Sequence, residues 1–160
     1  MQNQNDLETR ATESDNQELK LWLRLLTCSN LIENRIRSYL RIEFETTLPR
    51  FDLMAQLAQE PKGMKMGDLS ERLMVSNGNI TAITSQLEKE DLIVRIVNKD
   101  DRRSTFIKLT PKGKRQYTKM AKAQGKWLEQ MFDGLSPTSS RSLYKSLADL
   151  KKRILLNDEQ

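Results

Sequence analysis

Residues 66–113 constrain the fold of this chain more than any other stretch. A short segment with apolar spacing, Met66 to Leu73, leads through a turn that contains Gly78 into a longer amphipathic segment. Two runs rich in β-branched residues, Ile93–Val97 and Thr105–Leu109, follow with a charged tip between them. A helix, a turn, a second helix and a hairpin in this order predict a winged helix-turn-helix, a module that reads duplex DNA.

The composition favours a polyanionic partner and offers little catalytic chemistry. Lys and Arg total 27 against 22 Asp and Glu, a formal net charge of +5, and a basic balance favours polyanions. The chain has no histidine, so it lacks the usual general base and the commonest metal ligand. It also lacks a glycine-rich phosphate loop and a serine-centred nucleophile elbow. We therefore expect a protein that is not an enzyme and that needs no metal or cofactor.

Cysteine usage and hydropathy both indicate a cytoplasmic protein. Cys28 is the only cysteine, so no intramolecular disulfide can form. Its place in an apolar helical run favours a buried structural thiol over a redox sensor. The longest apolar-rich run, Leu19 to Leu26, is too short and too charged to span a bilayer. Residues 1–17 contain no apolar signal-peptide region.

Long helices are expected on both sides of the reading module, which makes the fold mainly α with a small β-hairpin wing. We expect a flexible arm over 1–17, dimerisation helices over 18–48 and 111–157, and a winged helix-turn-helix domain over 49–110. The last helix carries an apolar stripe of Leu143, Leu147, Leu150 and Ile154. The first helix is apolar on several sides, and such a helix needs cover from several directions. Dimerisation through these helices is our interpretation, and packing within one chain is the alternative.

Inward-facing stripes at helical spacing are predicted for the other helices as well. In the first helix the stripe includes Leu19, Trp22 and Leu26. In the helix that follows Pro49 it consists of Phe51, Met54, Leu57 and Ala58. In the second helix of the reading module it consists of Ile80, Ile83 and Leu87.

The starts of three helices have clear sequence signals. Ser76 is a suitable N-cap for the second helix of the reading module. Thr110 and Ser136 each precede a proline, and a capping residue followed by proline is typical of the first helical position. Helices are therefore predicted to begin at Pro111 and Pro137.

The predicted DNA-reading face consists of small polar residues. In a helix-turn-helix, residues near the start of the second helix meet the base edges. Amides suit adenine, hydroxyls suit phosphate or base, and an alanine methyl suits thymine. The predicted contacts on this helix are Ser76, Asn77, Asn79, Thr81, Ala82 and Ser85. The alternative is an ordinary amphipathic helix with a solvated polar face.

The hairpin tip adds a second predicted contact. Arg102 and Arg103 are expected to reach the minor groove, where narrow A·T tracts concentrate negative potential. Asp101 is expected to hold these arginines by a charge-assisted hydrogen bond. Lys65 could contact a phosphate. The alternatives are a solvated charged turn and a solvated surface lysine.

Several motifs resemble the MarR (multiple antibiotic resistance regulator) family of bacterial repressors, over roughly Leu19 to Leu155. They are the wing Asp101-Arg102-Arg103, the segment Leu109-Thr110-Pro111-Lys112-Gly113, and Asp68 to Thr81 in the helix-turn-helix. The resemblance implies a homodimer with two winged domains on a pseudopalindromic operator. It also implies release of DNA when a small, often aromatic, ligand binds between the dimerisation and reading regions.

Two stretches are similar to the branch of that family that controls hydroxycinnamate degradation, namely 48–54 and 74–81. This similarity implies ferulate, p-coumarate or their coenzyme A thioesters as ligands. An aromatic acid needs apolar walls and a cation or hydrogen-bond donors. Our candidate residues for this site are Trp22, Leu26, Ser29, Asn30, Arg50, Phe51, Met54 and Tyr117. The alternatives are plain core for the apolar residues and a surface charge for Arg50.

The sequence therefore predicts a repressor that binds its operator as a homodimer and releases it on binding an aromatic acid or an aromatic acyl-CoA. A MarR-like activator and a redox sensor that uses Cys28 are alternatives within the family. A winged-helix protein-interaction module is an alternative of a different class.

Overall fold

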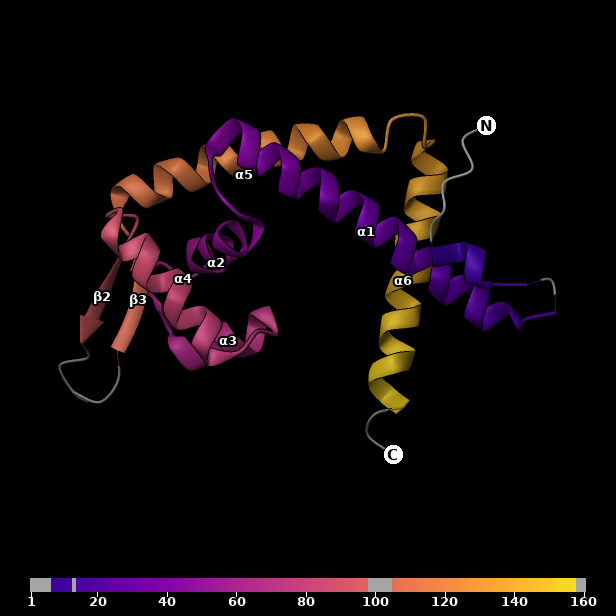
Figure 1. The fold of residues 1–160 in the computed structure, drawn as a ribbon, viewed down its shortest axis with the longest axis horizontal. Helices are drawn as coiled ribbons and strands as arrows, with labels where there is room; N and C mark the ends of the chain where they lie inside the picture. The colour runs from indigo at the N-terminus through magenta and orange to yellow at the C-terminus, as the bar shows by residue number, and fades with distance from the viewer. Residues whose placement is uncertain (1–6, 13, 98–104, 158–160) are drawn as a thin grey trace. The chain divides into compact units, whose positions relative to one another are not determined.

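The computed structural model describes residues 7–12, 14–97 and 105–157, and within them the chain is mostly helical with one small antiparallel sheet (Figure 1). The elements in chain order are the 3-10 helix η1 (Leu7–Arg10), α1 (Gln17–Phe44), α2 (Leu48–Ala58), β1 (Met64–Lys65), α3 (Met66–Leu73), α4 (Asn77–Lys89), β2 (Ile93–Val97), β3 (Thr105–Leu109), α5 (Pro111–Met131) and α6 (Pro137–Asn157). The chain divides into two compact units, Met1–Gly125 and Lys126–Gln160. The first unit contains all elements from η1 to β3 and most of α5.

The three predicted helix caps are present. The Ser76 hydroxyl accepts a hydrogen bond from the Asn79 amide (3.3 Å), and the Thr110 hydroxyl accepts one from the Gly113 amide (3.0 Å). The Ser136 hydroxyl accepts from the Ser139 amide at 3.0 Å. Each cap satisfies one of the amides that a helix start leaves without a partner. The predicted starts at Pro111 and Pro137 are thereby confirmed.

The sheet has the strand order β1-β3-β2 and is antiparallel throughout. The two predicted strands are observed, with Ile93 opposite Leu109 and Val97 opposite Thr105. β1 was not predicted, because two residues cannot show an alternating pattern. Its Met64 pairs with Ile107 at the centre of the sheet.

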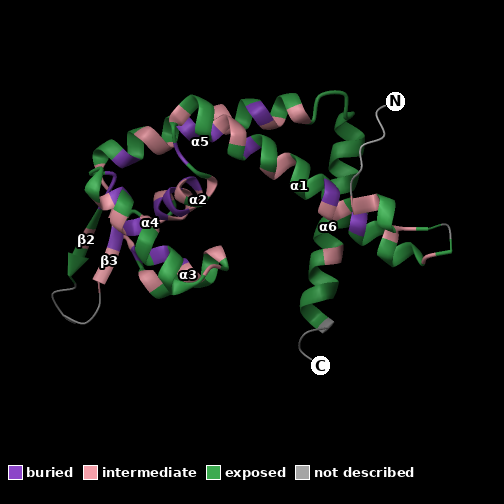
Figure 2. Cartoon of the chain, in the orientation of Figure 1, coloured by how far each residue is buried: buried purple, intermediate pink, exposed green. Residues whose placement is uncertain are grey.

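The core of the first unit lies where α2, α3, α4 and the sheet meet. Figure 2 shows the buried residues gathered on α2 and on single faces of its neighbouring helices. The members with the least exposed side chains are Leu53, Met54, Leu57, Leu69, Ile80, Thr84, Leu87, Leu92 and Ile107. Leu53 and Thr84 are buried although the predicted stripes omit them, whereas Ala58 and Ile83 of those stripes are only half-buried. Several elements cover α2 and α4, so the buried face of each helix is wider than one row of residues.

α1 places its residues differently from the prediction. Leu23, Thr27, Ile36 and Leu40 are its buried residues, while Trp22 of the predicted stripe is 57% exposed. The expectation of a buried Cys28 is wrong, because this thiol is exposed. One residue is a rotation of about 100° around a helix, so Cys28 lies away from the face of Thr27.

The chain's first residues partly join the folded unit. η1 packs against α1, and the Glu8 carboxylate pairs with Arg24 of α1. Residues 1–6 and 13 of the predicted flexible arm lie outside the described residues.

α6, taken by itself, keeps the apolar stripe that the sequence predicted. Leu143, Leu147 and Ile154 are exposed, and Leu150 is half-buried. α1 likewise exposes Leu21 and Leu31. Within the described residues, no helix is both long and apolar enough to cross a membrane.

Candidate nucleic-acid interface

The turn between α3 and α4 is closed by reciprocal hydrogen bonds. The Ser70 hydroxyl donates to the Val75 carbonyl (2.6 Å), and the Val75 amide donates to the Ser70 carbonyl (3.2 Å). Met74 between them has a left-handed backbone (φ 53°), and its amide donates to the carbonyls of Ser70 and Glu71. These bonds end α3 and set the direction in which α4 begins. The expectation that the turn contains Gly78 is wrong, because α4 already begins at Asn77. The hydrogen bonds of the turn were not predicted from the sequence.

α4 has one face in the core and one face in solvent. Ile80, Thr84 and Leu87 are buried, and the Thr84 hydroxyl donates to the Ile80 carbonyl (2.8 Å), which satisfies it inside the core. The predicted contacts lie outside the core: Ser76, Asn77, Asn79, Thr81 and Ala82 are exposed, and Ser85 is half-buried. The structure therefore leaves five of the six predicted residues exposed and Ser85 partly covered.

Some polar groups of these residues form hydrogen bonds within the chain, and others do not. The Thr81 hydroxyl donates to the Asn77 carbonyl (2.9 Å), and the Ser76 hydroxyl accepts the capping bond. Within the described residues, the side-chain amides of Asn77 and Asn79 form no hydrogen bond. These two amides have their full capacity left for a ligand such as a base edge.

Arg95 of β2 links the wing to α4, a contact that was not predicted from the sequence. Its Nε lies 2.9 Å from a carboxylate oxygen of Glu88, and its Nη2 lies 3.4 Å from the Ser85 hydroxyl. A second contact of Nη2 reaches the Thr84 hydroxyl at 3.5 Å. Alternation could have indicated this role, because Arg95 falls on the strand face that begins with the buried Ile93.

The predicted wing contacts can be placed only in part. Asp101, Arg102 and Arg103 lie outside the described residues, so their roles remain predictions. Lys65 is exposed on β1, and its ammonium lies 5.8 Å from the centre of the Phe106 ring on β3. This distance is within the range of a cation–π contact.

The predicted ligand residues do not converge on one cavity. The rings of Phe51 and Tyr117 are in contact, with centroids 5.7 Å apart, and Phe51 and Met54 are buried in the core. Trp22 and Asn30 on α1 are exposed. Of the remaining three predicted residues, Leu26 is half-buried and Ser29 is exposed on α1. Arg50 forms an ion pair within the chain.

Arg50 already has a carboxylate partner within the chain. Its guanidinium pairs with Glu90, the residue that follows α4, and its side chain is 15% exposed. Among the residues that the structure describes, the buried Nε of Arg50 has no hydrogen-bond partner. This pair connects the start of α2 directly to the end of the reading helix.

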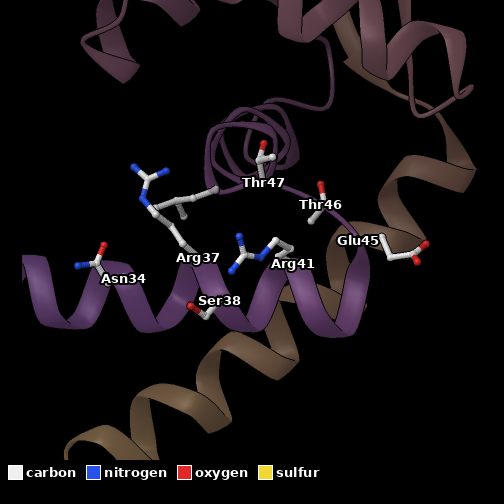
Figure 3. A pocket seen from close by; sticks show the side chains of 8 residues that line it. Asn34, Arg37, Ser38, Arg41, Glu45, Thr46 and Thr47 are labelled. Atoms are coloured by element: carbon white, nitrogen blue, oxygen red, sulfur yellow. The ribbon is translucent and has the colours of Figure 1, made fainter.

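Two of the cavities in the first unit lie beside the second half of α1. One, of about 560 Å³, is bounded by α1, α2, the helix-turn-helix and α5, and of the predicted ligand residues only Ser29 lines it. The other, of about 770 Å³, lies where α1 ends and α2 begins, and we call it the corner cavity (Figure 3). None of the predicted ligand residues lines the corner cavity.

The smaller cavity contains an unusual carboxyl group. Burial raises the pKa of Asp52, Arg37 acts in the opposite direction, and Glu33 raises the pKa further. Arg37 itself pairs with Glu33, with Nε 3.0 Å from Oε1. The cavity lining therefore combines two carboxyl groups and one guanidinium with apolar side chains from Ile32, Ile36, Leu73, Val75 and Ile83.

The fold and this surface together define a winged helix-turn-helix protein of the DNA-reading type. The helix-turn-helix presents small polar side chains, and a three-stranded sheet supports the hairpin beside it.

Comparisons with known proteins agree with this class. The MarR family profile matches residues 46–105. An uncharacterised HTH-type transcriptional regulator of Bacillus cereus is 28% identical over 133 residues, which cover 82% of this chain and 87% of that protein. The transcriptional activatory protein BadR of Rhodopseudomonas palustris is 27% identical over 104 residues, covering 64% of this chain and 59% of that protein.

Solved structures extend the match to most of the fold. The crystal structure of a MarR family transcriptional regulator from Silicibacter pomeroyi is 26% identical, with a TM-score of 0.74, and the match covers 90% of this chain and 99% of that one. These similarities support a MarR family transcriptional regulator. The relatives are regulators rather than enzymes, and dimerisation is typical of the family.

Proposed function

We propose that this protein is a ligand-responsive transcriptional repressor that binds a pseudopalindromic operator as a homodimer. The observation that carries the proposal is the exposed face of α4, on which Asn77 and Asn79 have unengaged amides beside a closed helix-turn-helix turn. Small side chains allow a helix to approach base edges closely. Arg102 and Arg103 of the wing supply the predicted minor-groove contacts.

The proposed dimer forms through the apolar surfaces of α1 and α6. Leu21 and Leu31 on α1, and Leu143 and Leu147 on α6, are exposed in the single chain. Large exposed apolar surfaces are typical of interaction sites. Two reading helices on one operator need half-sites about one helical turn apart, roughly 34–36 Å.

The proposed effector is an aromatic acid, such as ferulate or p-coumarate, or its coenzyme A thioester. The resemblance of residues 48–54 and 74–81 to the hydroxycinnamate branch supports this class. Arg50 supplies the cation in this proposal, and its present partner is Glu90 at the end of α4. A ligand carboxylate that competes with Glu90 would change a contact at the end of the reading helix. Such differential binding is what coupling between two sites requires.

The test uses the purified protein and its own upstream DNA in a fluorescence anisotropy titration. We expect Asn79→Ala and Arg103→Ala each to weaken binding by about tenfold, because each removes about one base or phosphate contact. Lys145→Gln on α6 is the matched control and should bind like the wild type. Wild-type affinity in both interface variants would contradict the proposed reading face.

The effector is tested by adding a panel of aromatic acids and their thioesters to the preformed complex. We expect one of these compounds to release DNA, and Arg50→Ala to reduce that release while DNA binding is retained. Release that is equally efficient with Arg50→Ala would remove Arg50 from the site.

Activation of transcription is the second candidate function. The relative BadR is named a transcriptional activatory protein, which favours this candidate. A reporter gene behind the upstream DNA separates the two functions. Deletion of the regulator gene raises reporter expression if the protein is a repressor and lowers it if the protein is an activator.

A further inference from the structure

We propose that an exposed basic ridge on α5 binds the phosphate backbone of a DNA duplex other than the operator. The basic ridge consists of Arg115, Lys119, Lys122 and Lys126. It contains none of the residues proposed to contact the operator or the aromatic effector. The inference rests on the proposed function in one respect, since α4 is taken to hold the operator while the ridge holds a second duplex.

The four cations of the basic ridge form one narrow stripe along α5. They follow one another at steps of four, three and four residues, which keeps them within about 60° of arc on a helix of 3.6 residues per turn. The buried residues of α5 are Gly113, Met120 and Trp127, which share the opposite side of the helix. Figure 2 shows exposed and buried positions alternating along α5. The ridge is therefore open to solvent along its whole length.

The basic ridge has no counter-charge within the described residues. None of its four cations forms an ion pair or a side-chain hydrogen bond there. Glu129 is the only acidic residue of α5, and it pairs with none of them. The arginines Arg50 and Arg95 of the first unit, by contrast, each pair with a glutamate. A row of uncompensated positive charges attracts a polyanion.

The basic ridge is remote from the residues proposed to read the operator. α5 starts where α4 ends, because the Lys112 ammonium donates to the Glu90 carbonyl (2.7 Å). Asn77 and Asn79 lie at the other end of α4, and a helix of 13 residues spans about 20 Å. Figure 1 shows the part of α5 that belongs to the first unit on the side opposite α3. A straight operator duplex at the start of α4 would therefore not reach the ridge.

The chemistry of the basic ridge favours duplex DNA over a membrane or a protein. Within the described residues, α5 exposes no large apolar side chain, whereas a helix on a membrane surface buries an apolar face. Protein interfaces likewise have apolar and aromatic residues at their centre. Duplex DNA carries one phosphate charge per about 1.7 Å of its axis. The ridge extends about 16 Å along α5, so it can contact several phosphates without reading the bases.

The charge of the basic ridge also argues against a place in the dimer interface. A two-fold interface uses the same surface of both chains, so cations of one ridge would face those of the other and repel them. The proposed dimer instead uses the exposed leucines of α1 and α6. Each chain of that dimer would carry one ridge in addition to its reading helix.

The experiment captures a second duplex on protein that is already bound to the upstream DNA. Biotinylated upstream DNA is immobilised at low density, saturated with the full chain, and exposed to a fluorescent duplex of scrambled sequence. Bound protein and captured duplex are measured separately. The ridge variant is Lys119→Gln with Lys122→Gln. The matched control is Lys62→Gln with Lys145→Gln, which removes the same charge from exposed positions outside the ridge.

We expect all three proteins to bind the upstream DNA equally, and the wild type and the control to capture equal amounts of the scrambled duplex. The ridge variant should capture it about tenfold more weakly at equal bound protein, because two phosphate contacts are lost. When capture is repeated at several salt concentrations, the slope of log affinity against log salt should be smaller by about 1.8, since each contact contributes about 0.9.

Three results would overturn the proposal. One is equal capture by the ridge variant and the control, or no capture by the wild type. Another is weaker binding of the ridge variant to the upstream DNA itself, which would place the ridge on the operator duplex. The third is displacement of the captured duplex by poly-glutamate more efficiently than by unlabelled duplex at equal charge concentration, which would assign the ridge to an acidic protein.

Failure of the proposed function has a separate signature, because the wild type would then not bind the upstream DNA at all. A direct anisotropy titration of the scrambled duplex decides on the basic ridge in that case. Equal affinity of the ridge variant and the control for this duplex would overturn the ridge proposal as well.

Discussion

At the scale of single residues, Gly113 shows why one small side chain is needed at the junction between the wing and α5. A Cβ atom at this position would lie 1.9 Å from the Leu92 carbonyl oxygen. The neighbouring Thr110 fixes the same junction, since its amide donates to the Leu92 carbonyl (3.0 Å) and its hydroxyl donates to the Asp91 carbonyl (2.6 Å). Backbone on both sides of the contact leaves no flexible side chain that could move away.

Gly113→Ala is therefore expected to destabilise the fold by about 3 kcal/mol or more, the upper range for forced overpacking. Denaturation in urea measures this loss. Gly125→Ala is the control, because a Cβ there meets nothing within 4 Å and should stabilise α5 by up to about 1 kcal/mol. Similar stability of the two variants would contradict the close approach at Leu92.

Asp52 is a second residue with a measurable signature. Because burial raises its pKa above the ordinary value of 3.8, the protonated form is favoured in the folded chain. The protonated form contributes its whole stabilisation of the fold below pH 3.8, and this contribution is lost as the pH rises through the raised pKa. At a pH above this raised pKa, ionised Asp52 costs stability.

Asp52→Asn should accordingly raise the melting temperature at pH 7. The gain should shrink toward about pH 3.5, where Asp52 of the wild type is protonated as well. Thermal unfolding across this pH range measures the difference. An equal gain in melting temperature at pH 7 and at about pH 3.5 would show that ionisation of Asp52 does not destabilise the fold.

At the scale of elements, the parts predicted best are those whose signals are local. The caps at Ser76, Thr110 and Ser136 act over three residues, so sequence neighbours are enough to place the helix starts. The strands Ile93–Val97 and Thr105–Leu109 have an equally local composition signal. β1 escaped prediction because its two residues form a strand only through pairing with β3.

The attachment of the wing to α4 depends on a contact between elements. Arg95 and Glu88 are partly exposed, and such ion pairs contribute at most about 1 kcal/mol to stability. The position of the strand relative to the reading helix is the property that this pair influences most.

Arg95→Gln is expected to weaken operator binding several-fold while stability falls by less than about 1 kcal/mol. Anisotropy titrations and urea denaturation measure the two effects. Lys89→Gln, which removes a neighbouring exposed charge of α4, is the control for the general loss of positive charge. If the two variants bind DNA equally, the Arg95 contact does not position the wing.

At the scale of the whole molecule, the exposed leucines of α1 and α6 are the largest feature that a single chain leaves unexplained. The proposed dimer would cover them, and dimerisation is typical of the MarR family. In this proposal a second chain would also cover Trp22, which is exposed although the apolar stripe of α1 predicts its burial.

Leu147→Lys should raise the dissociation constant of the dimer by about tenfold or more, because a buried leucine contributes about 1.5–3 kcal/mol. Sedimentation velocity at several protein concentrations measures the change. Ser146→Lys adds the same charge one residue earlier on α6 and should leave the dimer intact. Unchanged association of Leu147→Lys would exclude this face of α6 from the interface.

The sequence by itself determined the order and type of the elements, because caps, prolines and apolar periodicity act between residues that are close in the chain. The reading face of α4 was predictable for the same reason, since a single amphipathic helix specifies both of its sides. Only the tertiary structure decided which side chains meet. Arg50 pairs with Glu90 across 40 positions, Arg95 reaches Glu88 from the next element, and the corner cavity joins two helices. These partners depend on how the elements pack, and no local pattern records that packing.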